Sequence, residues 1–368
     1  MRSQVFTAIT CVAVVLTAAV AAATTRHVSP GGSDTADCTA GPCKTIGYAV
    51  GQAVAGDAVS VGPGIYKESI LVTKRLSLVG HASEIDATGH ANGVVISGAA
   101  AAGTILKDFT ITNADLEGVL AVQTSRITIA NNDVVFNDRL WDPVNIPLPC
   151  QKSDDCGEGL HLMSVTDSVV KENLVQHNVG GILLTDEKGP TFGNTIIGNR
   201  VLDNEKDCAI TLASHYFSMS GPAPANLGGV YRNVVVGNDA ERNGAAGVGI
   251  FTGPPGAAAY NNLVFGNIAR DNGLPGVALH SHAPFQYLND NVIVFNALSG
   301  NGADDDAATQ APTGISIFSA VIPIPRTTVA LNRIAHEHYG VFIVKAVNVF
   351  GLRTNQFASS VDVPVSIH

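Results

Sequence analysis

A short glycine-led motif recurs eight times along the chain and constrains its fold more than any other feature. Each copy starts with Gly, or once with Ala, and the first and third residues that follow are apolar. The copies start at Gly118, Gly159, Gly181, Ala209, Gly247, Gly276, Gly314 and Gly340. An apolar residue at every second position is the pattern of a β-strand with one buried face. The motif therefore predicts eight equivalent strands.

The spacing of the copies distinguishes between repeat architectures. Successive copies start 22 to 41 residues apart. Helical repeats would show a period of about 3.6 residues, and a propeller blade needs about 40 residues for its four strands. The shorter units have room for two or three short strands separated by corners, and such a unit cannot bury its apolar face alone. We expect each unit to be one coil of a parallel β-helix, with loops inserted where the spacing is longer.

Asparagines recur between these strands. Asn tolerates the left-handed backbone conformation of a corner, and stacked amides can hydrogen-bond along the axis of the coils. We interpret the recurring asparagines as architectural; they are Asn173, Asn199, Asn238, Asn267, Asn296 and Asn332.

Composition limits the core and the partners. The chain has 368 residues, of which 46% are hydrophobic but only 6% aromatic, so the core must consist mostly of Val, Ile, Leu and Ala. The net charge of −10 argues against nucleic acids and anionic membrane surfaces as partners. We expect a monomer.

The N-terminus has the form of a secretory signal. Arg2 precedes an apolar run at 5–20, and Ala21 and Ala23 supply the small residues of a cleavage site. The sequence predicts a signal peptide at 1–23 and a single secreted domain at 24–368.

Export favours disulfide bonds between nearby cysteines. We expect Cys38 to pair with Cys43 and Cys150 with Cys156, each pair closing one loop. Cys208 remains, at the start of an apolar strand, and is interpreted as a buried free thiol.

The N-terminal stretch HVSPGGSDTADCTAGPCKTIGYAVGQAVAGDAVSVGPGIYKE, followed by these repeats, resembles the secreted right-handed parallel β-helix proteins of the pectin-lyase-like class. The repeat type is similar to that of carbohydrate-binding and sugar-hydrolysing β-helices. The resemblance implies an all-β, right-handed parallel β-helix with an N-terminal cap at 24–58, a short capping helix within 44–54, and coils at 59–368.

The resemblance specifies chemistry less closely than fold. Repeats of this kind occur in lyases, hydrolases, epimerases and proteins without known activity. The Asp-Pro-His-Asp motif of alginate epimerases is absent from the sequence, and the three-aspartate pattern of polygalacturonase-type hydrolases is not recognisable.

Candidate catalytic residues lie on the outward side of the aligned strands. The second and fourth residues after each motif glycine should face solvent, and the fifth and sixth should reach the next corner. Asp186 and Glu187 then neighbour His215, and a carboxylate beside a histidine is an arrangement for general acid/base catalysis. We predict that Asp186 and His215 form the catalytic pair, supported by Glu187, His161, His280 and His282.

Inserted loops at 137–158, 215–229 and 301–313 are expected to flank this face. Together they would form a trough that suits an extended polysaccharide. Aromatic rings in it would offer flat faces to sugar rings. The residues expected to contact the substrate are Phe251, Phe318, His280 and Trp141.

The same face suggests two alternative metal sites. His215, His280 and His282 would form a histidine-based site if the register brings them together. Asp304, Asp305 and Asp306 are consecutive carboxylates that could hold Ca²⁺.

Three functional classes remain open. A uronate lyase or epimerase needs a cation to hold the substrate carboxylate, and the scarcity of such groups on this face argues against that class, since Lys188, Arg326 and Lys345 lie only near its margins. A glycoside hydrolase needs two carboxylates on either side of a bond, whereas the side chains of Asp186 and Glu187 should diverge. A non-catalytic glycan-binding or structural surface protein needs only the trough and its aromatic residues.

Overall fold

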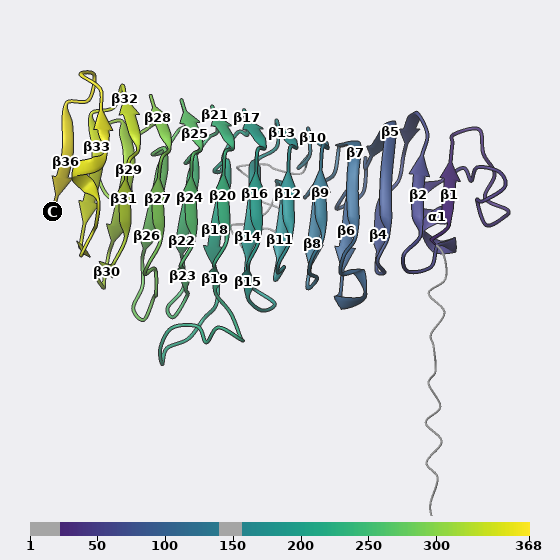
Figure 1. Cartoon of the computed structure of the whole chain (residues 1–368), viewed down its shortest axis with the longest axis horizontal. Coiled ribbons are helices and arrows are strands. Elements are labelled where there is room, and N and C mark those ends of the chain that lie inside the picture. Colours follow the sequence, from purple (N-terminus) through teal and green to yellow (C-terminus); the bar gives the residue numbers. More distant parts are fainter. Residues whose placement is uncertain (1–22, 140–156) are drawn as a thin grey trace, which may run out of the picture.

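The computed structural model describes residues 23–139 and 157–368. The predicted signal sequence before residue 23, Trp141 and the pair Cys150/Cys156 lie outside these residues. The chain winds into a right-handed parallel β-helix whose coils stack from α1 (Ile46–Gln52) at one end to β36 (Val363–Ile367) at the other (Figure 1). This confirms the expected fold.

Within the described residues, one 11-stranded parallel sheet contains all the glycine-led motifs. Its strands are β4 (Ile70–Val72), β6 (Val94–Ser97), β8 (Val119–Val122), β11 (Glu158–Met163), β14 (Gly180–Thr185), β18 (Ile210–Ser214), β22 (Val248–Thr252), β26 (Val277–Ser281), β29 (Thr313–Ser319), β33 (Tyr339–Val344) and β36.

A 20-stranded sheet, again counted over the described ranges, forms the rest of the wall as two rows. The long strands β5 (Ser77–Asp86) and β7 (Ile105–Thr112) pair with both rows. The first row adds β1 (Thr25–Val28), β2 (Ala58–Val61), β9 (Thr128–Ala130), β12 (Val169–Lys171), β16 (Thr195–Ile197), β20 (Val234–Val236), β24 (Leu263–Phe265), β27 (Val292–Val294) and β31 (Thr328–Ala330). The second adds β3 (Gly64–Tyr66), β10 (Asp133–Val135), β13 (Leu174–Gln176), β17 (Arg200–Leu202), β21 (Asp239–Glu241), β25 (Ile268–Arg270), β28 (Ala297–Ser299), β32 (Arg333–Ala335) and β35 (Gln356–Phe357).

Short ladders and single turns complete the coils. One ladder joins β15 (Thr191–Phe192), β19 (Val230–Tyr231) and β23 (Ala259–Tyr260), and another joins β30 (Ile324–Pro325) and β34 (Ala346–Val347). Within residues 23–139 and 157–368 the 3₁₀ turns are η1 (Ala99–Ala101) and η3 (Leu352–Thr354). No helix in the described part of the chain is long and apolar enough to cross a membrane.

The predicted register of the 11-stranded sheet is confirmed. The first apolar residues of all eight motifs pair in one continuous line, and all are buried: Val119, Leu160, Ile182, Ile210, Val248, Val277, Ile315 and Val341. These side chains, with the third-position residues beside them, fill the interior of the solenoid. The Val, Ile, Leu and Ala residues that dominate the composition therefore form one continuous core along the axis of the solenoid.

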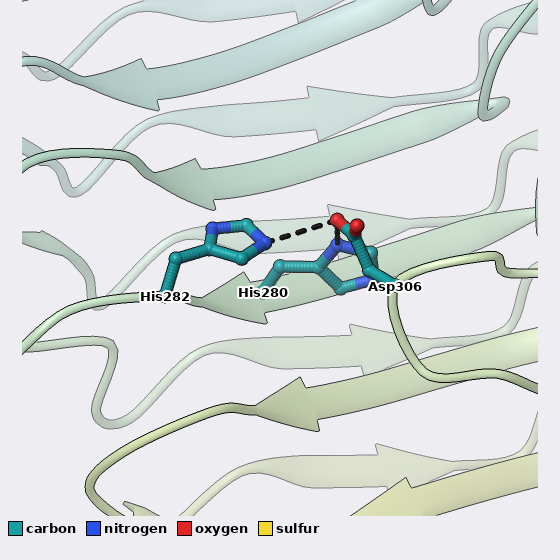
Figure 2. Close-up of side chains that lie close together, drawn as sticks. All are labelled: His280, His282 and Asp306. Atoms are coloured by element: carbon teal, nitrogen blue, oxygen red, sulfur yellow. Dashed lines mark hydrogen bonds and ion pairs between the residues drawn. The ribbon is translucent and has the colours of Figure 1, made fainter.

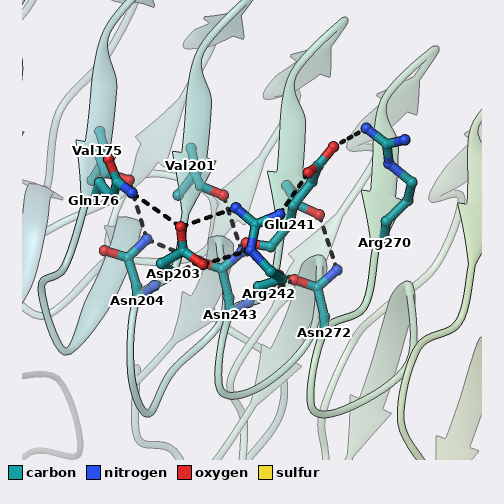
Figure 3. A network of polar contacts seen from close by, with 11 residues as sticks. Val175, Gln176, Val201, Asp203, Asn204, Glu241, Arg242, Asn243, Arg270 and Asn272 are labelled. Carbon is teal, nitrogen blue, oxygen red and sulfur yellow. Dashed lines mark hydrogen bonds and ion pairs between the residues drawn. The ribbon is translucent and has the colours of Figure 1, made fainter.

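The asparagines form buried ladders along the axis, as expected. In the interior rungs the backbone N–H and Nδ2 of one asparagine donate to Oδ1 of the asparagine in the next coil; Asn199 donates to Asn238 at 2.9 and 3.0 Å, for example. Its Nδ2 also donates to the Val170 carbonyl of the preceding coil at 3.0 Å. Figure 3 shows the same pattern at Asn204, Asn243 and Asn272.

The expectation that these asparagines adopt the left-handed backbone conformation is wrong. Positive φ falls instead on the residue immediately before each one: Glu172 (55°), Gly198 (65°), Gly237 (63°), Gly266 (64°), Phe295 (59°) and Leu331 (59°). The preceding residue makes the corner, and the asparagine then starts the next strand with its side chain turned inward to bond the coils on either side.

On the outer surface beside the ladder, charged and polar side chains of neighbouring coils form ion pairs and hydrogen bonds. Asp203 accepts from Arg242 Nε at 2.6 Å and from Gln176 Nε2 at 3.0 Å, and Glu241 binds both Arg242 and Arg270 (Figure 3). Such exposed pairs contribute little to stability individually. Their effect here is to cover the outer rim of the buried ladder with a polar surface.

The N-terminal helix is present where the resemblance placed it. The Thr45 hydroxyl caps α1 by accepting from the backbone N–H of Tyr48 at 3.3 Å, and the Glu68 carboxylate accepts from the first two helical N–H groups. The helix buries Ile46, Ala49 and Val50 against the first coils. The predicted disulfide between Cys38 and Cys43 lies beside it.

Candidate functional site

In the five coils that start at Gly181, Ala209, Gly247, Gly276 and Gly314, the strand alternation continues through the sixth residue after the start. The fifth residue therefore points inward at the corner rather than outward, and the sixth points outward. The fifth residues of these five coils are buried: Asp186, Ser214, Thr252, Ser281 and Ser319. The other three coils differ, since Gln123 and Lys345 are exposed at the fifth position and Val165 is buried at the sixth. This alternation separates two neighbouring residues, Asp186 and Glu187, onto opposite sides of the wall.

Asp186 does not form the predicted side-chain pair with His215. Its carboxylate is 2% exposed and accepts hydrogen bonds from Ser214 Oγ at 2.8 Å, from the backbone N–H of His215 at 2.6 Å and from the backbone N–H of Gly229. Burial raises the pKa of Asp186, and these hydrogen bonds act in the opposite direction. Asp186 thus organises the corner and anchors both ends of the loop at 215–229.

Glu187 takes the position predicted for Asp186. Its Oε1 lies 2.8 Å from Nδ1 of His215, and about a quarter of each side chain is exposed (26% and 27%). Burial alone would raise the pKa of Glu187, but hydrogen bonds from His215 and Thr185 outweigh it and lower the pKa to about 2. An ionised carboxylate therefore orients the imidazole across the physiological pH range.

His161 was expected on the outer face but is only 1% exposed. Its Nε2 lies 2.8 Å from the Thr185 hydroxyl, and Thr185 in turn bonds Glu187, so His161 connects to the Glu187–His215 pair from within the wall. Its Nδ1 lies 3.5 Å from Oε1 of Glu117.

Two glutamates that the sequence reasoning missed stand beside His161. Glu117 and Glu158 are buried, and one donor atom of each lies within 4.8 Å of a ring nitrogen of His161. Each glutamate directly precedes a motif glycine in consecutive coils, which is the signal that would have revealed them. Burial and the Glu117 charge raise the pKa of neighbouring Asp138 to about 7, so this region concentrates acidic groups.

A second cluster lies on β26 and the loop before β29. His280 Nε2 lies 2.7 Å from Oδ2 of Asp304, and His282 Nε2 lies 3.0 Å from Oδ2 of Asp306. Figure 2 shows His280 and His282 side by side with Asp306 reaching across them from its loop. His280 is buried, whereas the side chains of His282 and Asp306 are partly exposed.

The predicted aromatic residues flank His280 in register. Phe251 pairs with His280 from the preceding coil and Phe318 from the following one, with ring centroids 5.2 and 5.7 Å from that of His280. The rings therefore pack around a histidine as well as facing outward. Trp141 lies outside the described residues.

The cluster borders a cavity of about 350 Å³. The loop at 301–313 supplies its acidic wall through Asp304, Asp305 and Asp306, which confirms that this insertion rises beside the sheet. Asp207 and the buried free thiol of Cys208 also line the cavity. Its size is that of a small-ligand pocket.

Gln286 is a further residue that sequence reasoning missed. Its Oε1 accepts from Ser281 Oγ and from the backbone N–H of His282, both at 2.7 Å, and its Nε2 donates to the Thr252 carbonyl at 2.9 Å. The amide thereby fixes the corner that carries His282.

Sequence and structure comparisons agree on the fold. Residues 70–357 match the family described as the right handed beta helix region. No curated protein matches the chain.

Solved structures with the same architecture include three of different kinds. The Dettilon tailspike protein gp208 aligns with a TM-score of 0.50 and 14% identity, over 91% of this chain and 66% of the tailspike. The Streptococcus pneumoniae surface adhesin PfbA gives 0.46 and 11% over 87% of each chain. The A-module of the Azotobacter vinelandii mannuronan C-5 epimerase AlgE6 gives 0.46 and 12%, over 84% of this chain and 90% of the module. At these identities the likeness is one of fold alone.

Proposed function

We propose that this chain, which belongs to the right-handed β-helix family, is an exported protein that binds an extended polysaccharide on the outer face of the 11-stranded sheet and acts on it by proton transfer. The observation that carries the proposal is the hydrogen-bonded, partly exposed pair of Glu187 and His215 on that face. Export is supported by the Cys38–Cys43 disulfide, since such bonds persist in oxidising compartments.

His215 would be the general base and Glu187 its positioning residue. Glu187 accepts the Nδ1 proton, which selects the neutral tautomer whose lone pair is on Nε2, the atom that would act as the base. The arrangement keeps the imidazole in one tautomer and stabilises the imidazolium formed when it takes a proton.

The position of Asp186 favours proton abstraction over glycoside hydrolysis. Hydrolysis requires two carboxylates that flank one bond. Asp186 is committed to the corner and Glu187 to His215, so this pair of carboxylates does not serve that reaction. β-Elimination from a uronate-containing chain needs one base to take the proton beside the carboxylate, whereas epimerisation also needs a donor that returns a proton to the opposite face of the sugar. Lys188, exposed next to Glu187, would supply a cation for the substrate carboxylate.

Substrate contacts would extend from the pair toward the cavity. His282 occupies the same outward position as His215, two strands further along the sheet, so the two lie about 10 Å apart. An extended chain that spans both would pass Phe251 on β22, and a chain that continues one strand further would reach Phe318 on β29. The ring faces of both residues suit sugars.

The test is a panel of neutral and uronate-containing polysaccharides incubated with the mature protein. Unsaturated products are read by absorbance, reducing ends by a colorimetric assay and epimer content by proton NMR. We expect product from a uronate-containing chain, and at least a hundredfold loss in His215→Ala. The matched control is His336→Ala, an exposed histidine that follows β32 of the 20-stranded sheet, which should retain activity.

Two outcomes would contradict the proposal. Full activity of His215→Ala would remove the catalytic role of the pair. Retention of glycans without any product, unchanged in that variant, would leave a binding protein in which the histidine is architectural.

A further inference from the structure

The histidine and aspartate side chains beside the cavity converge on one point. His280 and His282 are two residues apart on the strand β26 and its corner, so both face outward on the same side. Oδ2 of Asp306 lies 3.4 Å from Nδ1 of His280 and 3.0 Å from Nε2 of His282. One donor atom from each of the three residues lies within 4.8 Å of the others (Figure 2).

Each imidazole is held at its other nitrogen by a fixed acceptor. His280 Nε2 lies 2.7 Å from Oδ2 of Asp304, which is 1% exposed, and the other oxygen of that carboxylate accepts from the backbone N–H of Ala307. His282 Nδ1 lies 3.2 Å from the carbonyl oxygen of Thr252. Since a neutral imidazole carries one N–H, both rings then present a lone pair toward Asp306.

Two imidazole lone pairs and a carboxylate oxygen facing one another repel unless a cation lies among them. Histidine that ligates a metal usually donates its second N–H to a carboxylate or a backbone carbonyl, which fixes its tautomer and orientation. Asp304 and Thr252 provide these two acceptors. Protonation of both rings is the alternative that would also remove the repulsion.

We propose that His280 Nδ1, His282 Nε2 and a carboxylate oxygen of Asp306 bind a divalent transition-metal ion of the Zn²⁺ type. Two nitrogens and one oxygen suit Zn²⁺ and its neighbours, whereas Ca²⁺ takes six to eight oxygen ligands. The three protein ligands leave coordination positions open toward the cavity of about 350 Å³, where water or an oxygen ligand would complete the site.

This site differs from both alternatives drawn from the sequence. His215 follows β18, two strands away, and its ring is engaged by Glu187. Of the three consecutive aspartates, only Asp306 belongs to the group of converging donor atoms, while Asp304 orients His280. The metal proposal does not rest on the proposed polysaccharide chemistry, because it follows from the donor geometry alone.

The test uses the mature chain without a histidine tag, stripped with a chelator and titrated with Zn²⁺ by calorimetry, with Co²⁺ as a spectroscopic probe. We expect one ion per chain, and visible Co²⁺ bands that report nitrogen ligands. His282→Ala and Asp306→Asn should each weaken binding at least a hundredfold. Asp304→Asn should weaken it roughly 10- to 100-fold, because it removes only the acceptor that orients His280.

The chain offers a matched control. His338 and Asp362 form an exposed pair at 2.9 Å with side-chain exposures of 38% and 71%, close to the 37% and 57% of His282 and Asp306. His338→Ala should leave Zn²⁺ affinity unchanged, as should His215→Ala. Thermal unfolding checks that each variant is folded, and the exposure of His282 and Asp306 makes their loss tolerable.

Two results would overturn the assignment. Zn²⁺ affinity equal in wild type, His282→Ala and Asp306→Asn would mean that the contacts are ion pairs between protonated rings and carboxylates. Preferential binding of Ca²⁺, lost on substitution of Asp305, would assign the loop to a carboxylate site. Because binding is measured without a glycan, failure here leaves the polysaccharide proposal intact, and the reverse also holds.

Discussion

Nδ1 of His215 lies 2.8 Å from Oε1 of Glu187, while the backbone N–H of the same histidine donates to Asp186 at 2.6 Å. Two consecutive carboxylates on one coil thus hold a single residue of the next coil, one by its ring and the other by its backbone. Asp186 and Glu187 bind different parts of His215 because the strand alternation points Asp186 inward and Glu187 outward. Substitutions at the two positions should therefore have different effects.

Glu187→Gln should affect activity more than folding. The glutamine amide can donate to Nδ1, which would move the imidazole proton to Nε2 and remove the base. We expect kcat/KM to fall on the order of 10²- to 10⁴-fold. Glu187→Asp should restore part of the activity, and the pH profile of kcat/KM should shift in both variants. An unchanged profile in Glu187→Gln would show that Glu187 does not position the base.

Asp186→Ala should affect folding. It leaves the Ser214 hydroxyl and two backbone N–H groups without their charged acceptor in a buried corner. We expect the free energy of unfolding to fall by about 2 to 4 kcal/mol, measured by denaturant titration. Glu187→Gln at the same corner is the control and should change it far less. Equal stability of the two variants would contradict the assigned architectural role.

Two adjacent asparagines have different roles: Asn262 belongs to the buried ladder, and Asn261 forms the corner before it. Asn262 is buried and donates to the Val230 carbonyl and to Asn291, whereas Asn261 is exposed with φ of 55°. Asn262→Ala should lower the free energy of unfolding by about 2 to 4 kcal/mol. Asn261→Gly should change it by less than about 1 kcal/mol, since glycine adopts positive φ without strain. Calorimetric melting compares them, and a larger loss in Asn261→Gly would reverse the assignment.

Glu337 should make stability depend on pH. Burial raises its pKa to about 7, although Asn301 donates to its Oε1 from the backbone and the side chain. A carboxyl group whose pKa is raised on folding favours the folded state below its unfolded pKa near 4.5, and this contribution is lost as pH rises through about 7. We expect a loss of up to about 3 kcal/mol between pH 4.5 and 8 from this group.

Glu337→Gln should flatten that part of the profile. The glutamine keeps the acceptor for Asn301 and adds an N–H donor where Glu337 Oε2 has no partner among the described residues. Chemical unfolding at pH 5 and pH 8 gives the comparison. If wild type and variant lose stability equally over this range, Glu337 is not the responsible group.

The strand register was predictable because it depends only on local spacing. Aligning the motif glycines placed Val119 and Leu160 in contact although 41 residues separate them, and the structure pairs them. The asparagines were equally accessible to sequence reasoning, since each lies at a fixed distance from a strand. Their backbone conformation could not be predicted from the sequence, because residues on either side of a corner can adopt positive φ.

The site was predictable only in part. His280 was correctly placed between Phe251 and Phe318, because all three lie at the same position of the repeat. The hydrogen-bond partners of His280 and His282 could not be predicted, because Asp304 and Asp306 lie in an inserted loop whose conformation the repeat does not determine. The choice between Asp186 and Glu187 failed for a different reason: both residues were expected to reach the corner, but in this coil the strand alternation continues through it and turns Asp186 inward.

Each asparagine ladder has a chemically defined last rung. Nδ2 of Asn355 donates to the carbonyl of Leu352 three residues earlier, and Nδ2 of Asn291 donates in the same way to the carbonyl of Leu288. Glu337 accepts from Asn301 but has no side-chain N–H that could donate to a further coil. Interior rungs such as Asn204, Asn243 and Asn272 instead present the same donors and the same acceptor to each neighbour. A coil copied or deleted between them would meet matching groups on both sides. The middle of this protein can therefore lengthen or shorten by duplication and loss of whole coils, while its terminal coils must keep their identity.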